Sequence, residues 1–199
     1  MSPTDRYRQV ASLHAASINQ GFLATLGVPF LSLMYRSIDQ AEGSVLLIEE
    51  QDGRVVGFVS GASGMGPIYR RMIRHPLRLL LSLAPSLVRP KRLWRILETF
   101  RYSRGNARPA DWPDAELLSI AVEPEMRGKG VSERLYRRLE DHFKRQGKPA
   151  FRIIVGKALG PAHRYYQRMG AVPIGLVEVH AGEESIVYVH RLADKGENF

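Results

Sequence analysis

The stretch from residue 116 to residue 145 constrains the fold more than any other, because it reads as a strand, a turn and a helix in direct succession. Residues 117–122 are a short apolar run of the length that a sheet core accepts. Pro124 ends this run, and Gly128 and Gly130 follow. Apolar side chains then recur at helical spacing, at Val131, Leu135, Leu139 and Phe143. A glycine turn that opens a helix leaves backbone N–H groups unpaired at the positive end of the helix dipole, so this stretch predicts a phosphate-binding site.

The spacing of the glycines excludes two common phosphate-binding motifs. A P-loop requires two glycines separated by four residues and followed by Lys-Ser/Thr, whereas this chain has only Gly128-Lys129-Gly130. A dinucleotide-binding turn requires a third glycine, and Glu133 occupies that position. An ordinary strand–helix turn that happens to contain glycine remains the alternative.

The turn resembles motif A of the GNAT N-acetyltransferases, Arg/Gln-x-x-Gly-x-Gly/Ala. Arg127, Gly130 and Ser132 fall on its three positions, and Ser132 departs from the usual Gly or Ala. In that family the loop holds the pyrophosphate of acetyl-coenzyme A. The resemblance therefore implies acetyl-CoA as co-substrate, bound by Arg127, Gly128, Lys129, Gly130, Val131 and Ser132.

A second stretch resembles motif B of the same family, Asn-x-x-Ala-x-x-x-Tyr-x-x-x-Gly-Phe. Ala162, Tyr166 and Gly170 match it in register, while Leu159 and Ala171 replace its Asn and Phe. The two motifs occur in the family's order and at the family's spacing. The resemblance adds Ala162 and Tyr166 to the expected coenzyme site, together with the backbone of Ile120, Ala121 and Val122, which in the family pairs with pantetheine.

Acetyl transfer to an amine requires a base for the amine and an acid for the departing thiolate. Glu116 opens the central strand and resembles the glutamate that several family members use as general base. Tyr166 stands on the motif B tyrosine, which in the family can act as general acid. The alternatives are a strand-end carboxylate that faces solvent and an aromatic core residue beside Tyr165.

The rest of the chain predicts an α/β protein. Residues 11–26 and 29–38 carry helical periodicity, whereas 45–50 and 55–60 flank Asp52-Gly53 as a hairpin. Residues 151–155 predict a strand, and residues 172–179 and 185–190 predict a second hairpin. This order resembles a single GNAT domain over residues 1–199, with a mixed central sheet flanked by helices. Its initial strand is expected within the first ten residues.

The positive charge is concentrated in one segment. Eleven Lys or Arg residues lie between Arg70 and Arg108 against a single acid, Glu98, in a chain whose net charge is +9. We interpret residues 67–113 as a basic helical insertion between the third and fourth strands, broken at Pro76, Pro85 and Pro90. It could be a lid, a dimer contact, a site for an anionic acceptor or a peripheral contact with an anionic membrane. Nucleic acid is not expected, because no base-reading motif or stacking platform accompanies the charge.

Other sequence features argue against alternative chemistry. The chain has no cysteine, and its six histidines show no metal-ligand spacing, so we expect neither thiolate catalysis nor a metal. Residues 1–6 contain no apolar signal core, and the apolar run 77–88 is too short to span a bilayer, which predicts a cytoplasmic protein.

Together these features predict an acyl-CoA-dependent N-acyltransferase. It would transfer acetyl from acetyl-CoA to the amine of a small molecule, such as an amino sugar or a nucleotide-linked sugar, by direct attack on the thioester. The alternative is a non-catalytic acyl-CoA-binding or membrane-associated module.

Overall fold

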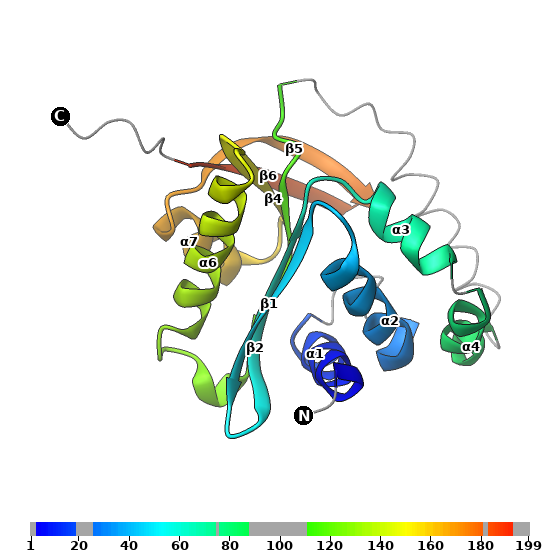
Figure 1. Ribbon diagram of the computed structural model, residues 1–199. Coiled ribbons are helices and arrows are strands. Elements are labelled where there is room, and N and C mark those ends of the chain that lie inside the picture. The colour runs from blue at the N-terminus through cyan, green and yellow to red at the C-terminus, as the bar shows by residue number, and fades with distance from the viewer. Residues whose placement is uncertain (1–2, 19–25, 75, 88–110, 181–182, 193–199) are drawn as a thin grey trace.

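In the computed structural model, a six-stranded sheet separates two layers of helices (Figure 1). The structure describes residues 3–18, 26–74, 76–87, 111–180 and 183–192. Its elements, in chain order, are α1 (Pro3–Ser17), α2 (Gly27–Gln40), β1 (Ser44–Gln51), β2 (Arg54–Ala62), α3 (Gly66–Ile73), α4 (Pro76–Leu87), β3 (Glu116–Val122), the 3₁₀ turn η2 (Pro124–Met126), α6 (Val131–Arg145), β4 (Ala150–Gly156), α7 (Gly160–Arg168), β5 (Val172–His180) and β6 (Glu183–Arg191).

The strands lie in the order β1-β2-β3-β4-β6-β5. All neighbours are antiparallel except β3 and β4, which run parallel and are joined through α6. The mixed α/β sheet predicted from the sequence is therefore confirmed. Asp52 and Gly53 both have positive φ, which is the geometry of the tight turn expected between β1 and β2.

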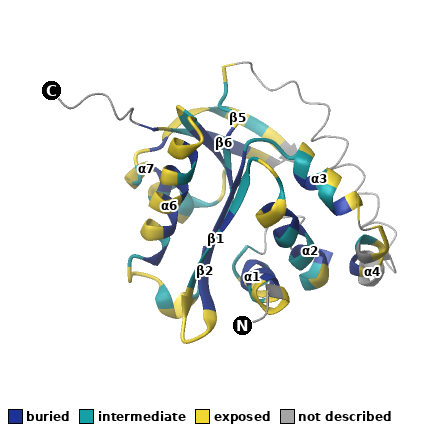
Figure 2. Ribbon diagram, viewed as in Figure 1, coloured by how far each residue is buried: buried dark blue, intermediate teal, exposed yellow. Residues whose placement is uncertain are grey.

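Each face of the sheet has its own apolar core. On one face, α1, α2 and α3 pack over Phe58, Ala62 and Ala121. On the other, α6 buries Val131 and Leu135 together with Leu139 and Phe143, the residues whose spacing predicted the helix, and α7 lies beside it. Figure 2 shows these inward faces in dark blue, with exposed residues on the outer sides of the helices.

The expected initial strand is wrong. Residues 3–17 are helical, and Tyr7, Val10, Ala11 and His14 recur at the spacing of one helix face and are buried. This face packs on α2 and the sheet, so the first helix begins earlier than Ala11. In the part of the chain that the structure describes, the basic segment therefore follows the second strand, β2, rather than a third.

Two helices of the basic segment, α3 and α4, lie within the described residues, and residues 88–110 lie outside them together with the expected break at Pro90. Pro76 is the first residue of α4, as a proline at a helix start should be. The expected break at Pro85 is wrong, because α4 continues through it to Leu87. Pro85 lies in the tenth position of the helix and has no N–H to donate to the carbonyl four residues earlier.

Candidate active site

The two parallel strands separate where the site begins. β3 and β4 pair at only two positions, Glu116 with Arg152 and Leu117 with Ile153. Beyond Leu117, the β4-facing edge of β3 is open, while its other edge remains paired with β2. The backbone of Ile120, Ala121 and Val122 lies in this open part, where its polar groups can bind an extended ligand as a sheet edge binds a strand.

A β-bulge accompanies the separation. On β2, Ser60 faces Ser119 whereas Gly61 faces Leu117, so Leu118 is an extra residue in β3. A bulge twists its strand and re-aims the neighbouring side chains. As a result, Leu118 packs in the α1–α2 core, whereas Leu117 and Ile120 pack on the α6 side.

The loop before α6 has the geometry of an anion site. Gly128 and Gly130 have φ of +76° and +73°, and Gly130 is the N-cap of α6 with no side-chain capping bond. The first bond of the helix runs from the N–H of Arg134 to the carbonyl of Gly130 at 3.0 Å. The N–H groups of Val131, Ser132 and the residue after them therefore point out of the helix end, where they and the helix dipole favour a phosphate.

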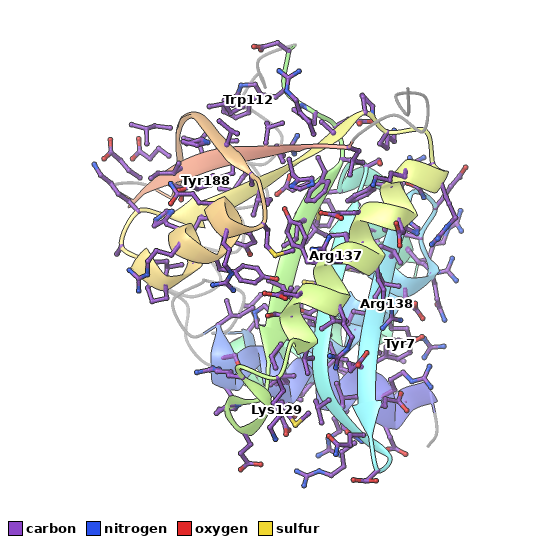
Figure 3. The ribbon with its side chains drawn as sticks, turned by 90° about the vertical axis from the view of Figure 1, so that its left-hand side faces the viewer. Tyr7, Trp112, Lys129, Arg137, Arg138 and Tyr188 are labelled. Atoms are coloured by element: carbon purple, nitrogen blue, oxygen red, sulfur yellow. The ribbon has the colours of Figure 1, made fainter. Side chains whose placement is uncertain are left out.

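This loop is held in place from outside. Arg134 Nη1 donates to the carbonyl of Lys129 at 3.2 Å, and the same guanidinium pairs with Glu49 on β1 at 3.0 Å. Arg127 follows η2 and donates its N–H to the carbonyl of Pro124 at 3.2 Å. Figure 3 shows Lys129 on the loop at the N-terminal end of α6. The positive-φ turn is thus preorganised rather than left to the ligand to order.

Helix α7 joins the loop through a tyrosine. The Tyr165 hydroxyl donates to the carbonyl of Ser132 at 2.9 Å, and burial raises the pKa of Tyr165 to about 12. Ala162 is partly buried on the α6 side of the sheet. The structure therefore brings the loop of motif A and the helix of motif B into contact through Ser132 and Tyr165.

Tyr166 is buried among aromatic rings. Its ring lies 5.2 Å from that of Tyr165, 6.3 Å from Tyr136 and 6.5 Å from Tyr188, between ring centroids. Burial raises the pKa of Tyr166 above its usual range, so its hydroxyl is a weaker acid than that of an exposed tyrosine. This ring is packed on the α6 side of the sheet.

Glu116 lies on the other face and is engaged by an arginine. Its Oε2 accepts from Nη2 of Arg152, whose Nη1 donates to the carbonyl of Pro113 at 2.5 Å. The Arg152 side chain is 6% exposed and that of Glu116 is 19% exposed. Leu117 and Ile153 point to the α6 side, so strand alternation places Glu116 and Arg152 on the side of α1 and α2. Glu116 and Tyr166 therefore lie on opposite faces of the sheet.

A polar chain on the Glu116 face also reaches β3. Ser119 is hydrogen-bonded to Tyr35, whose hydroxyl lies 2.5 Å from Nδ1 of His14. Tyr35 and His14 are buried in the α1–α2 core, where burial lowers the pKa of His14 to about 4. This chain connects helix α1 to the bulged part of β3.

A second histidine is fixed on the coenzyme side. His163 Nε2 lies 3.1 Å and 3.2 Å from the carbonyl oxygens of Gly156 and Lys157, so it donates. Nδ1 is then the acceptor and receives the hydroxyl proton of Tyr188 at 2.9 Å. Tyr188 lies on β6 close to α7 (Figure 3).

Sequence patterns predicted no role for Arg152, Tyr35, His14 or His163. A signal for Arg152 was present, because it stands alone between Phe151 and Ile153 in an apolar strand, and a buried arginine needs an acceptor. Tyr35 and His14 fit a helical apolar face and carried no separate signal. Among the described residues, no group of three or more His, Cys, Asp or Glu side chains could hold a metal ion.

Comparison with known proteins decides the family. The model of the acetyltransferase (GNAT) family matches residues 15–171, which is more than half of the chain. The chain belongs to the GNAT acetyltransferase family. The family resemblance of the two motifs is thereby confirmed, and the site lies within the matched region of this GNAT acetyltransferase. No curated protein sequence matches the chain significantly.

Solved structures share the GNAT fold at low sequence identity. The ribosomal-protein-S18-alanine N-acetyltransferase from Escherichia coli is 14% identical with a TM-score of 0.56, covering 100% of this chain and 95% of that one. An N-acetyltransferase from Staphylococcus aureus Mu50 is 13% identical with a TM-score of 0.61, covering 96% of each. An aminoglycoside 6'-N-acetyltransferase complexed with coenzyme A is 10% identical with a TM-score of 0.61, covering 96% and 93%.

Proposed function

We propose that this GNAT enzyme transfers the acetyl group of acetyl-CoA to the amine of a small molecule by direct attack on the thioester. The observation that carries the proposal is the open edge of β3 beside the unpaired N–H groups of the α6 N-terminus. These two features lie at the ends of the same segment, Glu116 to Ser132, so one extended phosphorylated ligand can use both. A coenzyme with a pyrophosphate and a pantetheine arm has this form.

Different residues of the chain would bind different parts of acetyl-CoA. The N–H groups of residues 128–132 would hold the pyrophosphate, since Gly128 and Gly130 let it approach the backbone closely. Arg127 and Lys129 would add charge at the rim. The backbone of Ile120, Ala121 and Val122 would orient the pantetheine arm, and Ala162 would line the α7 side. Acetyl-CoA, when bound, supplies the thioester whose C–S bond breaks as the amide N–C bond of the product forms.

Two side chains would move protons. Tyr166 stands on the motif B position and would donate its hydroxyl proton to the departing sulfur, which needs one as the C–S bond breaks. Glu116 would accept the proton of the attacking amine, directly or through water. Arg152 would hold the Glu116 carboxylate in one orientation at the start of β3. Acid and base then act from opposite faces of the sheet, which leaves the acceptor side to α1, α2 and the basic segment.

An amino sugar or a nucleotide-linked sugar is the proposed acceptor class. The support is the basic segment, which carries eleven Lys or Arg residues between 70 and 108. Its described helices, α3 and α4, pack on the α1–α2 side of the sheet, where Glu116 lies. Arginine clusters bind phosphate groups through paired N–H donors.

Release of free thiol from acetyl-CoA, measured with a panel of amines that includes amino sugars and nucleotide-linked amino sugars, tests this proposal. We expect turnover with at least one sugar amine and binding of acetyl-CoA by calorimetry without an acceptor. Acetyl-CoA binding with no turnover on any amine would favour the non-catalytic acyl-CoA-binding module. Absence of acetyl-CoA binding would overturn the proposal itself.

A further inference from the structure

Four large apolar side chains of α3 and α4 are exposed, and we call them the leucine face. Ile73, Leu77, Leu80 and Leu81 are 63%, 69%, 56% and 64% exposed. Leu77, Leu80 and Leu81 stand three and four residues apart, so they share one side of α4. Single exposed leucines are ordinary, but a contiguous apolar face on consecutive helices marks an interaction surface.

The opposite sides of these helices already have partners. Ile68 and Met72 of α3 are buried in the α1–α2 core. Leu79 of α4 packs against the same core, and the buried Ser82 donates its hydroxyl to the carbonyl of Leu79 at 2.8 Å. The leucine face therefore cannot turn inward without exposing residues that the core uses. A helix that is apolar on both sides is expected to have a partner on each.

The leucine face is bordered by positive charge. Arg70 and Arg74 of the α3 region are exposed, and Arg71 is held by Gln40 of α2 through donors at 3.1 Å and 3.2 Å. The sequence has no acid between Gly66 and Leu87. An anionic lipid surface has two layers, phosphate headgroups outside and acyl chains beneath them. The arginines suit the headgroups, and the exposed apolar side chains suit the acyl chains.

We propose that α3 and α4 dock the protein on an anionic lipid surface, with the leucine face in the acyl boundary and the arginines at the headgroups. α4 has 12 residues and is thus about 18 Å long, well short of the ~30 Å hydrocarbon core. Among the described residues, none forms a helix long and apolar enough to cross a membrane. α4 therefore lies in the plane of the interface. Its exposed leucines, Leu77, Leu80 and Leu81, would face the lipid.

A second copy of the chain fits this surface less well than lipid does. A two-fold contact brings the same patch of each copy together, so the arginines of one copy would face those of the other. An acidic protein would supply the missing charge, but it would also need an apolar groove shaped to the leucine face. A lipid surface supplies both without any specific shape.

The docking surface leaves the coenzyme site open. α3 and α4 lie beside α2, whereas α6 and α7 cover the other face of the sheet (Figure 1). Bound lipid would therefore not obstruct the loop at residues 127–132. The inference does not depend on acetyl transfer, so a failure of either proposal leaves the other standing.

Co-sedimentation of the full chain with vesicles tests the proposal. We expect binding to vesicles of phosphatidylcholine mixed with phosphatidylglycerol, little binding to phosphatidylcholine alone, and weaker binding as NaCl is raised. The variant R70Q/R74Q should partition about 25-fold less, because one basic residue near an anionic leaflet contributes roughly fivefold. The matched control R8Q/R145Q removes two exposed arginines from α1 and α6 and should bind like the wild type.

A second pair of variants tests the leucine face. The variant L77S/L80S/L81S should lose vesicle binding, whereas V172S/L176S, which removes exposed apolar residues from β5, should keep it. Thermal unfolding by circular dichroism shows that each variant is folded, and acetyl-CoA binding provides a readout independent of lipid. Failure of the wild type to bind phosphatidylglycerol vesicles at low salt would overturn the proposal. A dimer that the triple variant abolishes would assign the face to a second copy instead.

Discussion

At the scale of single residues, the two tyrosines of α7 have different environments. The hydroxyl of Tyr165 is committed to the carbonyl of Ser132, and it thereby ties α7 to the coenzyme loop. Tyr166 is surrounded by rings, and burial raises the pKa of its hydroxyl. Family resemblance singled out Tyr166 as the candidate acid. Only the structure shows that the neighbouring hydroxyl, that of Tyr165, is instead hydrogen-bonded at the start of α6.

The first prediction concerns this pair. Tyr166→Phe removes one hydroxyl and should retain acetyl-CoA binding, while kcat falls by roughly 10²–10⁴-fold, the range for loss of an acid–base group. Tyr165→Phe is the matched control. It should weaken coenzyme binding by loosening the Ser132 carbonyl and leave kcat nearly unchanged. Steady-state kinetics and calorimetry measure both, and unchanged kcat in Tyr166→Phe would make Tyr166 a core aromatic only.

Arg152 and His14 show why the sequence did not predict the partners of individual side chains. Arg152 was visible as a polar residue in an apolar strand, but its partner is Glu116, 36 positions earlier. That pairing depends on the register of two parallel strands, which no local pattern specifies. His14 is hydrogen-bonded to Tyr35, 21 positions later on another helix, and its burial is equally a product of tertiary packing.

At the scale of elements, local patterns predicted most strands and helices well. The Asp52-Gly53 turn and the apolar stripe of α6 follow from turn chemistry and apolar spacing. The bulge at Leu118 was not predictable, since it inserts one residue into a strand without changing its composition. The prediction of an initial strand within the first ten residues was wrong, because it followed the family's element order although the apolar spacing of these residues is helical.

The second prediction concerns the turn before α6. Gly130→Ala places a Cβ at a φ of +73°, which costs about 1–2 kcal/mol and shifts the N–H groups that face the pyrophosphate. Acetyl-CoA affinity should fall about tenfold or more. Gly147→Ala is the matched control, because Gly147 has a φ of +69° beyond the other end of α6.

Both glycine variants should lose similar stability, and only Gly130→Ala should lose affinity. Chemical denaturation and calorimetry separate the two effects. Equal affinity in both variants would show that the α6 N-terminus does not bind the coenzyme. Lys129→Ala should lose less affinity than Gly130→Ala, since the backbone carries most of the site.

The third prediction concerns the link between β3 and β4. Arg152→Met leaves the Glu116 carboxylate without its arginine in a largely buried position, and removal of one partner from such a pair costs about 3–5 kcal/mol. The double variant Arg152→Met/Glu116→Leu should recover most of that stability, because no unpaired charge remains. Urea denaturation of the two single variants and the double variant measures the coupling.

Glu116→Gln in the same series separates structure from catalysis. It should keep the fold and lower kcat if Glu116 is the base. Full turnover in Glu116→Gln would show that the Glu116–Arg152 pair stabilises the contact between β3 and β4 and has no part in catalysis. Additive losses of stability in the double variant would contradict the coupling.

At the scale of the whole molecule, the two faces of the sheet carry different groups of residues. The α6–α7 face holds the candidate coenzyme site, and the α1–α2 face carries Glu116, the Ser119–Tyr35–His14 chain and the basic helices. Sequence predicted the charge of the second face but not its geometry, because the orientation of α3 and α4 depends on which leucines the core already uses.

The last prediction concerns how this second face responds to acid. Burial holds the pKa of His14 at about 4, below its ordinary value of about 6.5. As pH falls below 6.5, His14 becomes protonated in the unfolded chain, whereas in the folded chain it stays neutral until about pH 4. His14 therefore contributes stability that is fully present above pH 6.5 and is lost as pH falls toward 4.

Between pH 7 and pH 5 this loss amounts to about 2 kcal/mol for His14 alone. His142 and His190, whose pKa values are also lowered by burial, act in the same direction, whereas burial raises the pKa of Glu140 and opposes them.

His14→Phe keeps a ring against Phe58 but removes the titration, so its unfolding free energy should depend less on pH in this range. Tyr35→Phe removes the hydrogen-bond partner and keeps the histidine, so its slope should match the wild type. Urea unfolding at both pH values measures the slopes, and an unchanged slope in His14→Phe would show that this histidine is accessible to protons in the folded protein.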